Sequence, residues 1–415
     1  MDIIFKSPVI KNEIKAISSK SEAHRYLICA ALADGKSEII CTDTNADIEA
    51  TVSCLNSLGA KIERSKDRFA VEPIKEVPKE ATLDCNESGS TLRFLVPLVT
   101  ALGVSSSFLM RGRLADRPLS PLRELLTEKG ISFSEQGKSP LLIKGSLSCG
   151  EYVLEANVSS QFISGLLFAL SICEGESKLS LLNKVESAPY IDMTVDALIS
   201  FGANLSHDKS LNRYYVKGLK KLRSPKKLTV GGDWSNSAFF LSAGVIGKNA
   251  VTVTGLDASS SQGDKKIIDI LKQMGAKITC DGNKITAFPS ALCGVDIDAS
   301  QIPDLVPILA TVASIADGQT LIYNASRLRL KESDRIESVC SMLTSLGADV
   351  NPTSDGMVIR GKRSLKGGKT DSFNDHRIAM SAAIASTVCS ESVEVTNFEA
   401  INKSYPSFLD NFEIL

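Results

Sequence analysis

The fold is decided by the stretch SSKSEAHRYLICAALADG, which runs from Ser18 to Gly35. Small polar residues and Lys20 come first, apolar and small residues follow, and a glycine ends the stretch. Serine caps the free N–H groups at a helix start, and glycine adopts the left-handed conformation that commonly ends a helix. The stretch therefore predicts a buried helix whose reactive side chains lie on its first turn.

The same pattern recurs five times along the chain. The later segments also open with polar residues and continue with small and apolar ones, and their markers are Ser90, Gln161, Asn236, Asp304 and Asp375. Counted from Ser21, successive markers are separated by 69, 71, 75, 68 and 71 residues. A regular period of this kind indicates a fold made of repeated units.

A second pattern repeats out of phase with the first. Apolar helical segments end at Gly59, Gly130, Gly202, Gly275 and Gly347, which are separated by 71, 72, 73 and 72 residues, and a strand pattern follows each one. The chain ends inside a sixth helical-looking segment, 408–415. We therefore predict an α/β protein of six units of about 70 residues, each with two helices and intervening strands.

The length favours two domains of three units each. A chain of 415 residues exceeds what one hydrophobic core usually holds. The segment Ser224–Lys227, with a turn-forming serine, a proline and two lysines, is the best internal boundary. We predict one domain of residues 18–226 and a second of residues 1–17 plus 227–415, so that the chain crosses between them twice.

The composition excludes several classes of partner. Lysine and arginine number 47 against 48 for aspartate and glutamate, so no global basic field attracts nucleic acid or a membrane, and an anion site must be a local cluster. No run of eighteen apolar residues and no apolar leader is present, and we expect a cytoplasmic protein, by preference a monomer. The ten cysteines are scattered singly and there are three histidines, which predicts buried free thiols and no metal site.

The helix starts predict where that anion site lies. A helix N-terminus has unpaired N–H groups and about half a positive charge, so anions bind there. Ordinary capping explains any one start, but it does not require the cations Lys20, Arg25, Arg93 and Arg377 as well. If the starts converge on one cleft, they focus positive potential on it.

Two further stretches carry clustered charges. The segment Arg111–Pro118 places three arginines on a glycine- and proline-containing loop. The segment Arg327–Arg335 alternates basic and apolar residues, which predicts a strand and then a helix bearing Glu332 and Arg335. Taken alone, residues 331–335 fit an ordinary helical surface pair equally well.

These motifs, in this order and over the whole chain, closely resemble the family of 5-enolpyruvylshikimate-3-phosphate synthases. The matching segments are Lys20-Ser21 with Arg25, Gly89 with Arg93, Arg117-Pro118, Ser159–Gln161, Ser187 with Pro189–Asp192, Ile302–Asp304, Lys331–Arg335, Asn374–Arg377, and Lys403 with Pro406. The resemblance implies two domains, each of three βαβαββ repeats, with the helix N-termini facing the cleft between them. It also implies transfer of the enolpyruvyl group of phosphoenolpyruvate to the 5-hydroxyl of shikimate 3-phosphate, with release of phosphate and with no metal or organic cofactor.

The resemblance also implies residue roles. Phosphoenolpyruvate would contact Lys20, Gly89, Arg117, Gln161, Arg335, Arg377 and Lys403. Shikimate 3-phosphate would contact Lys20, Ser21, Arg25, Ser159, Ser160, Gln161, Ser187, Tyr190, Asp304 and Lys331. We expect Asp304 to act as base toward the 5-hydroxyl and Glu332 to donate a proton to the methylene carbon, an assignment whose direction stays open. Lys20 and His376 would shape the charge around the leaving phosphate.

The chain departs from the family pattern at two positions. Where the family commonly has Asn-Ala-Gly-Thr, this chain has Glu87-Ser88-Gly89-Ser90, and an acid near an anion is unexpected. The second departure is Arg327, where the family often has an asparagine that touches the shikimate ring. Gly89 is retained, and a side chain there would crowd the pocket, which predicts sensitivity to glyphosate, a competitor of phosphoenolpyruvate.

Two other functions remain as alternatives. A sister enzyme transfers enolpyruvyl to UDP-N-acetylglucosamine on the same fold, but it usually has a cysteine in the loop corresponding to residues 114–118, and the nearest cysteines here are Cys85 and Cys149. A non-catalytic anion-binding relative should have lost some of the functional residues. Lys20, Asp304, Glu332 and Lys403 are all present, which favours the enzyme.

Overall fold

The computed structural model describes residues 1–414. Its internal contacts divide the chain into a first unit, Ser18–Val230, and a second unit, Met1–Ile17 with Gly231–Leu415. We predicted that residues 227–230 would belong to the second domain, but they belong to the first unit. The reason is that strand β15 (Lys227–Thr229) pairs in parallel with β4 (Ser37–Ile40) of the first repeat, a long-range contact that no local sequence pattern reveals.

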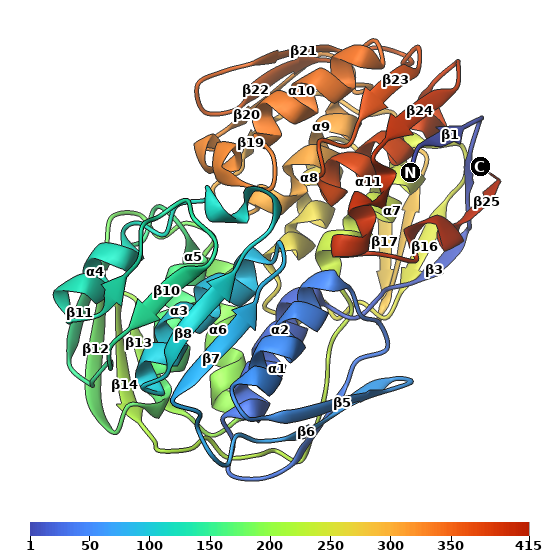
Figure 1. The fold of residues 1–415 in the computed structure, drawn as a ribbon. Helices are drawn as coiled ribbons and strands as arrows, with labels where there is room; N and C mark the ends of the chain where they lie inside the picture. Colours follow the sequence, from blue (N-terminus) through green and yellow to red (C-terminus); the bar gives the residue numbers. More distant parts are fainter. Residues whose placement is uncertain (415) are drawn as a thin grey trace. The chain divides into compact units, whose positions relative to one another are not determined.

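The first unit contains three four-stranded sheets, in the strand orders β15-β4-β6-β5, β7-β8-β10-β9 and β11-β12-β14-β13. Their remaining strands are β5 (Lys61–Ser65), β6 (Arg68–Glu72), β7 (Glu80–Asp84), β8 (Ser105–Leu109), β9 (Ser132–Phe133), β10 (Leu141–Lys144), β11 (Glu151–Glu155), β12 (Gly175–Leu182), β13 (Asn204–Asp208) and β14 (Arg213–Gly218). The helices are α1 (Lys20–Ala31), α2 (Ala46–Ser57), α3 (Gly89–Ala101), α4 (Leu122–Glu128), α5 (Ser160–Ile172) and α6 (Ala188–Ser200). Figure 1 shows these strands and helices in blue to yellow-green.

The second unit repeats this plan. Its four-stranded sheets have the orders β17-β18-β16-β3 and β19-β20-β22-β21, beside a three-stranded sheet β1-β24-β23 and the pair β2-β25. The strands are β1 (Ile3–Phe5), β2 (Val9–Ile10), β3 (Glu13–Lys15), β16 (Val251–Thr254), β17 (Lys277–Asp281), β18 (Lys284–Phe288), β19 (Asp296–Asp298), β20 (Gln319–Tyr323), β21 (Asp349–Pro352), β22 (Met357–Arg360), β23 (Gly368–Asp371), β24 (Val393–Thr396) and β25 (Phe412–Ile414). The helices are α7 (Trp234–Ile246), α8 (Ile267–Gln273), α9 (Val306–Ala313), α10 (Arg335–Ser345) and α11 (His376–Ala385).

Each repeat begins with a parallel strand pair and then adds antiparallel strands. The parallel pairs are β15 with β4, β7 with β8, β11 with β12, β3 with β16, β19 with β20, and β23 with β24. Parallel neighbours need a long crossover, and in the pairs β7 with β8, β11 with β12, β19 with β20, and β23 with β24 it contains the first helix of the repeat. The first pair of each unit takes its outer strand from another part of the chain, β15 in the first unit and the lead-in strand β3 in the second. The α/β repeat architecture is therefore as predicted.

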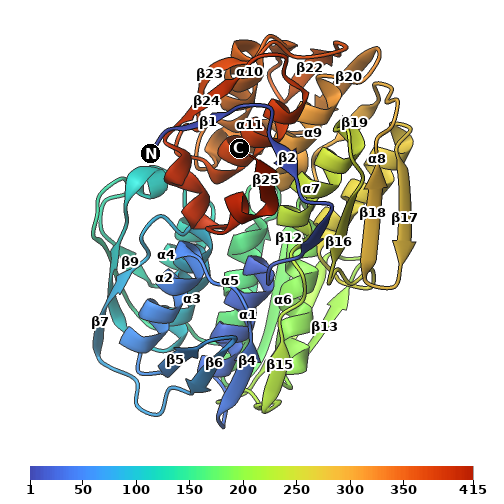
Figure 2. The same cartoon turned by 90° about the vertical axis from the view of Figure 1, so that its right-hand side faces the viewer.

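The sixth repeat departs from the expected pattern. We predicted a second helix over residues 408–415, but only a 3-10 turn, Phe408–Asn411, forms before the strand β25. The reason is that the lead-in strand β2 pairs with β25, so this segment completes a small sheet. The other lead-in strand, β1, lies antiparallel to β24, as Figure 2 shows.

The repeated glycines end the second helix of the first five units, as predicted. Gly59, Gly130, Gly202, Gly275 and Gly347 all have positive φ, between 71° and 102°. Residues with side chains avoid this region, and glycine does not. Each helix therefore ends where the sequence places a glycine.

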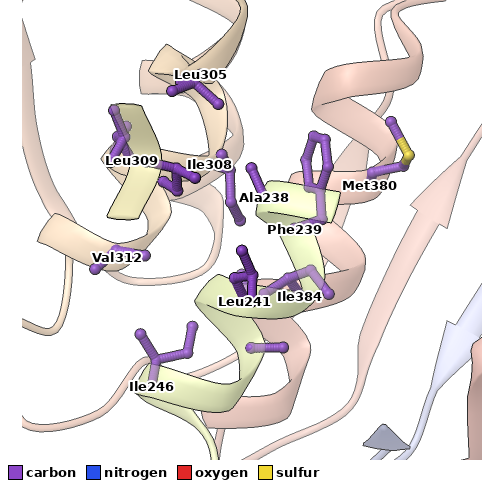
Figure 3. Close-up of a cluster of buried hydrophobic side chains, with 14 of the residues drawn as sticks. Ala238, Phe239, Leu241, Ile246, Leu305, Ile308, Leu309, Val312, Met380 and Ile384 are labelled. Carbon is purple, nitrogen blue, oxygen red and sulfur yellow. The ribbon is translucent and has the colours of Figure 1, made fainter. Parts of the chain in front are cut away.

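The first helices of the repeats form the core of each unit, with the strands around them. Nearly every residue of α3, α5, α7, α9 and α11 is buried. Figure 3 shows Phe239 and Leu241 of α7, Ile308 of α9 and Ile384 of α11 together in the second unit. In the first unit, α5 approaches α3 so closely that a Cβ at Gly165 would lie 2.4 Å from the carbonyl oxygen of Arg93. This packing fixes the helix starts that carry the functional residues.

Candidate active site

Most starts of the first helices are capped by a side chain. In α1, α3, α5, α7 and α11 the capping residues are Ser19, Ser88, Ser159, Asp233 and Asp375, each of which accepts a hydrogen bond from a backbone N–H two or three residues later. A cap satisfies part of the free N–H set and fixes the direction of the first turn. The side chains just after the caps are therefore held in defined positions.

Lys20 is the first residue of α1 and lies beside an acid, Asp47, that no sequence motif indicated. Its Nζ lies 2.8 Å from Oδ2 of Asp47, and the two side chains are 15% and 7% exposed. Asp47 lies in the first turn of α2, after the cap Asn45. An acid in a first helical turn looks like ordinary dipole stabilisation in sequence, so its pairing with Lys20 could be seen only in three dimensions.

Arg25 joins α1 to α6 by bonds to uncharged groups. Its guanidinium donates to Oγ1 of Thr194 at 2.8 Å, to the carbonyl of Ser21 at 2.6 Å and to the carbonyl of Tyr190 at 2.7 Å. It also lies over the ring of Phe94. Burial lowers the pKa of Arg25 to about 10, because its hydrogen-bond partners carry little compensating charge.

Gln161 joins α5 to α3. Its Oε1 accepts a hydrogen bond from Arg93 at 2.8 Å, and its Nε2 donates to Oγ of Ser90 at 2.9 Å. Arg93 also donates to the carbonyl of Pro118 at 3.3 Å. The amide of Gln161 is thereby fixed between two helix starts of the first unit.

Gly89 and Arg117 lie in contact. A Cβ at Gly89 would lie 2.8 Å from Nη1 of Arg117, so a side chain there would displace the guanidinium. Arg117 is only 8% exposed and follows the 3-10 turn Gly112–Ala115. The three arginines of this segment therefore lie on a loop, as predicted.

The serines predicted to hold phosphate occupy two helix starts of the first unit. Ser159 caps α5, and Ser160, the next residue, is 6% exposed. Ser187 precedes α6 with φ 54° and ψ 39°, a left-handed conformation unusual for a residue with a side chain. Its carbonyl accepts the N–H of Tyr190 at 3.1 Å. Strained backbone of this kind concentrates at functional sites.

In the second unit, three cationic side chains lie near the carboxylate of Asp304. Its Oδ1 lies 2.9 Å from Arg335 and 3.7 Å from Lys331, and its Oδ2 lies 3.0 Å from Arg377. Burial raises the pKa of Asp304, but the charges of Arg377, Lys331 and Arg335 outweigh burial and hold it well below the ordinary range. Asp304 is therefore ionised and is a weak base while these contacts persist.

Arg335 is bound by three carboxylates. Its Nε lies 2.8 Å from Oδ2 of Asp375, its Nη2 lies 2.9 Å from Oε2 of Glu332, and its Nη1 lies 2.9 Å from Oδ1 of Asp304. Burial lowers the pKa of Arg335, but Asp375, Glu332 and Asp304 outweigh it, so the pKa is raised. Asp375 also accepts from Ser333 at 3.2 Å. Asp375 is also the cap of α11. In the sequence its position indicated only capping and not the ionic contact with Arg335.

The remaining predicted residues of the second unit are also buried or partly buried. His376 follows Asp375 and is 2% exposed, with Nδ1 at 3.8 Å from Oδ1 of Asp375. Arg377 donates to the backbone carbonyl of Asp304 at 3.1 Å as well as to its side chain. Lys403, at the end of the 3-10 segment Phe398–Lys403, is 8% exposed.

The segment before α10 differs from its prediction. Residues 326–330 form a 3-10 turn and not a strand, and α10 begins at Arg335, so Glu332 precedes the helix. The alternation is not supported by a strand partner, and only Leu328 of the turn is buried whereas Leu330 is 45% exposed. The buried ionic contacts of Arg335 exclude a helical surface pair. Arg327 donates to the carbonyl of Ser300 at 2.9 Å.

Among residues 1–414, no group of three or more histidine, cysteine, aspartate or glutamate side chains could hold a metal ion. The helices of that range are all too short or too polar to cross a bilayer.

Comparison with known proteins places the chain in one family. The model of the family described as EPSP synthase (3-phosphoshikimate 1-carboxyvinyltransferase) matches residues 6–412. A 3-phosphoshikimate 1-carboxyvinyltransferase of Clostridium acetobutylicum is 44% identical over 412 residues, covering 98% of this chain and 95% of the relative. Another, from Clostridium perfringens, is 42% identical and covers 100% and 98%.

Solved structures agree. An EPSP synthase from Acinetobacter baumannii superposes with a TM-score of 0.80 at 27% identity, over 99% of this chain and 96% of that one. The enolpyruvyl transferase NikO from Streptomyces tendae has a TM-score of 0.77 at 16% identity, over 99% and 96%, and shares the fold. The chain belongs to the EPSP synthase (3-phosphoshikimate 1-carboxyvinyltransferase) family.

Proposed function

We propose that the functional residues of the first unit and those of the second unit have different roles in the family's reaction. The chain is a transferase: it transfers the enolpyruvyl group of phosphoenolpyruvate to the 5-hydroxyl of shikimate 3-phosphate and releases phosphate. This step lies on the route to chorismate and the aromatic amino acids. The cation cluster on Asp304 is the observation that best supports the division, because it joins a candidate base to candidate anion ligands within one unit.

The first unit holds shikimate 3-phosphate in this proposal. The ligand set is Lys20, Ser21, Arg25, Ser159, Ser160, Gln161, Ser187 and Tyr190, with Asp304 and Lys331 from the second unit. The support is that hydroxyls and cations lie at the starts of α1, α5 and α6, where N–H groups and the helix dipole favour a phosphate. Arg25 has uncharged hydrogen-bond partners, so a phosphate would add the opposite charge that its buried guanidinium lacks.

Phosphoenolpyruvate is held by Lys20, Gly89, Arg117, Gln161, Arg335, Arg377 and Lys403. Two opposite charges about 4 Å apart gain on the order of 4 kcal/mol at an effective dielectric near 20, before desolvation is subtracted. Several such cations suffice to hold a trianion. Arg335 already contacts three carboxylates, so we assign it chiefly to holding the acids and to orienting its neighbours.

The reaction proceeds by addition and elimination through a tetrahedral intermediate. Asp304 takes the proton of the 5-hydroxyl as its oxygen attacks the phosphate-bearing carbon of phosphoenolpyruvate, and Glu332 protonates the methylene carbon. Asp304 gains basicity if a substrate anion draws Arg377 or Lys331 away from it, because those cations hold its pKa down. Loss of the methyl proton and of phosphate then restores the double bond, with Lys20 and His376 next to the departing group.

A phosphate-release assay tests the function. The purified chain receives phosphoenolpyruvate with either shikimate 3-phosphate or UDP-N-acetylglucosamine as the only acceptor. We expect phosphate only with shikimate 3-phosphate, and release with neither acceptor would support a non-catalytic relative. In D2O, deuterium should enter the methylene group of the product because the intermediate carries a methyl group, and its absence would refute that intermediate. A cytoplasmic location and a monomeric state stay predictions.

A further inference from the structure

Glu87 stands two residues before Gly89, at the start of a helix that faces an anion in the proposed function. We propose that Glu87 is a positioning residue: it holds the loop of residues 110–118, and through that loop it sets the place of Arg117. This inference rests on the proposed role of Arg117 as a ligand of phosphoenolpyruvate.

The first support is that the segment containing Glu87 and the loop run side by side. Beyond the ends of the parallel strands β7 and β8, the N–H of Cys85 donates to the carbonyl of Leu109 at 2.9 Å, and the N–H of Arg111 donates to the carbonyl of Asn86 at 2.8 Å. The guanidinium of Arg111 also lies 2.8 Å from Oδ2 of Asp84. Glu87 and Gly112 are the next residues of the two segments.

The second support is a close contact between those two residues. A Cβ at Gly112 would lie 2.7 Å from Oε1 and 3.3 Å from Cγ of Glu87, so the acid lies against the bare Cα of the glycine. Gly112 also has φ 54°. A side chain at Gly112 would therefore meet both steric overlap with the acid and backbone strain. The acid at 87 and the glycine at 112 fit each other.

The third support is that Arg117 is fixed from the same helix start. Its guanidinium lies 2.8 Å from the Cβ position of Gly89. Between Gly112 and Arg117, Leu114 is 2% exposed and anchors the turn in the core. Just after Arg117, the carbonyl of Pro118 accepts a hydrogen bond from Arg93 at 3.3 Å. Loss of the contact at Glu87 would free the upstream end of the turn, only five residues before Arg117.

Charge adds to this packing. The loop carries Arg111, Arg113 and Arg117 within seven residues, and like charges at such spacing repel one another. A carboxylate against the same loop offsets that repulsion before any substrate is bound. The carboxylate of Glu87 thus lies against the loop at Gly112.

Steady-state kinetics of Glu87→Ala and Glu87→Gln test the proposal. We expect Glu87→Ala to raise KM for phosphoenolpyruvate about tenfold, with kcat and KM for shikimate 3-phosphate changed less than about twofold, because the binding of one substrate is affected. Glu87→Gln keeps the shape of the side chain and should stay within about threefold of wild type. An unchanged KM for phosphoenolpyruvate in Glu87→Ala, or equal loss for both substrates, would overturn the proposal.

Gly112→Ala and its double variant test the contact itself. Gly112→Ala should raise the same KM, and removal of the acid in Glu87→Ala/Gly112→Ala should relieve the overlap, so the two effects should not add. Gly130→Ala is the matched control, because Gly130 also has positive φ, at 86°, but has no atom within 4 Å of its Cβ position. Additive effects, or an equal KM effect from Gly130→Ala, would count against the contact.

Arg117→Gln separates this proposal from the proposed function. If Arg117→Gln raises KM for phosphoenolpyruvate and Glu87→Ala does not, the ligand role of Arg117 stands and the positioning role of Glu87 is wrong. If Arg117→Gln leaves that KM unchanged, the ligand role itself is wrong and the proposal for Glu87 fails with it.

Discussion

Arg25 in the first unit and Arg335 in the second unit are equally buried, yet their pKa values shift in opposite directions. Arg25 is 2% exposed and donates to two carbonyls and a hydroxyl, and its pKa is lowered to about 10. Arg335 is 1% exposed and contacts three carboxylates, and its pKa is raised. The partners, and not the depth of burial, decide the direction.

This difference separates two ways of building an anion site. A buried cation with uncharged partners gains free energy from an incoming phosphate, because the phosphate supplies the missing opposite charge. A buried cation surrounded by carboxylates is already compensated, and its effect is to keep those acids ionised and oriented. The comparison therefore assigns binding to Arg25 and organisation of the acids to Arg335.

The largest expected effect comes from Arg335. Arg335→Leu would leave Asp304, Glu332 and Asp375 together without their common cation, and breaking a buried pair in this way typically costs about 3–5 kcal/mol of unfolding free energy. Arg25→Leu removes bonds to uncharged groups and should cost less. Urea unfolding of both variants measures this. A larger loss in Arg25→Leu would contradict the comparison.

The next effect concerns the acids that Arg335 holds. Glu332→Ala and Asp304→Ala should each lower kcat at least about 10²-fold, because general acid–base groups typically contribute that much. A phosphate-release assay at saturating substrate measures kcat, and the circular dichroism of each variant shows whether the fold is kept. If either variant keeps wild-type turnover, the role given to that residue is wrong.

Local patterns predicted much of the fold and part of the site. The glycines at 59, 130, 202, 275 and 347 indicated the helix ends because a positive φ is a property of one residue. The parallel pairing of β15 with β4 and the antiparallel pairing of β2 with β25 join distant segments, and no local pattern predicts them. The boundary at 226 and the helix over 408–415 were wrong for this reason.

The same limit applies to the functional residues. Lys20 and Arg377 stood out as cations beyond what capping needs. Asp47 and Asp375 did not, because an acid at a helix start is common and already has an explanation. The contact of Asp47 with Lys20 depends on the packing of the two helices of one repeat, and that of Asp375 with Arg335 on the packing of helices from neighbouring repeats. Sequence spacing alone determines neither.

A smaller effect should appear in the acid stability of the first unit. His24 is fully buried, with Nδ1 at 2.7 Å from Oγ1 of Thr51, and burial lowers its pKa from about 6.5 to about 3. Between these values the unfolded chain binds a proton that the folded chain does not, so stability falls as pH drops below about 6.5, by at most about 1.4 kcal/mol per pH unit.

Unfolding measured from pH 7 to pH 5 checks this dependence. His24→Asn keeps a group that can bond to Thr51 and does not titrate, so its stability should fall less with decreasing pH than that of wild type. His207→Asn is the control, because His207 stacks on Tyr214 and is far less buried. An identical pH slope in wild type and His24→Asn would contradict the prediction.

The smallest effect is expected at Gly89, where the comparison between binding and organising arginines can be tested without removing a charge. In Gly89→Ala the new methyl group would lie 2.8 Å from Nη1 of Arg117 and would displace the guanidinium. Because Arg117 is assigned to binding, we expect KM for phosphoenolpyruvate to rise about tenfold with kcat largely kept. Inhibition by glyphosate, expected in wild type, should weaken in the same variant because the competitor occupies the same place. If Gly89→Ala instead lowers kcat and leaves KM unchanged, Arg117 acts on the reacting group and not in binding, and the first unit would then share the catalytic work assigned to the second.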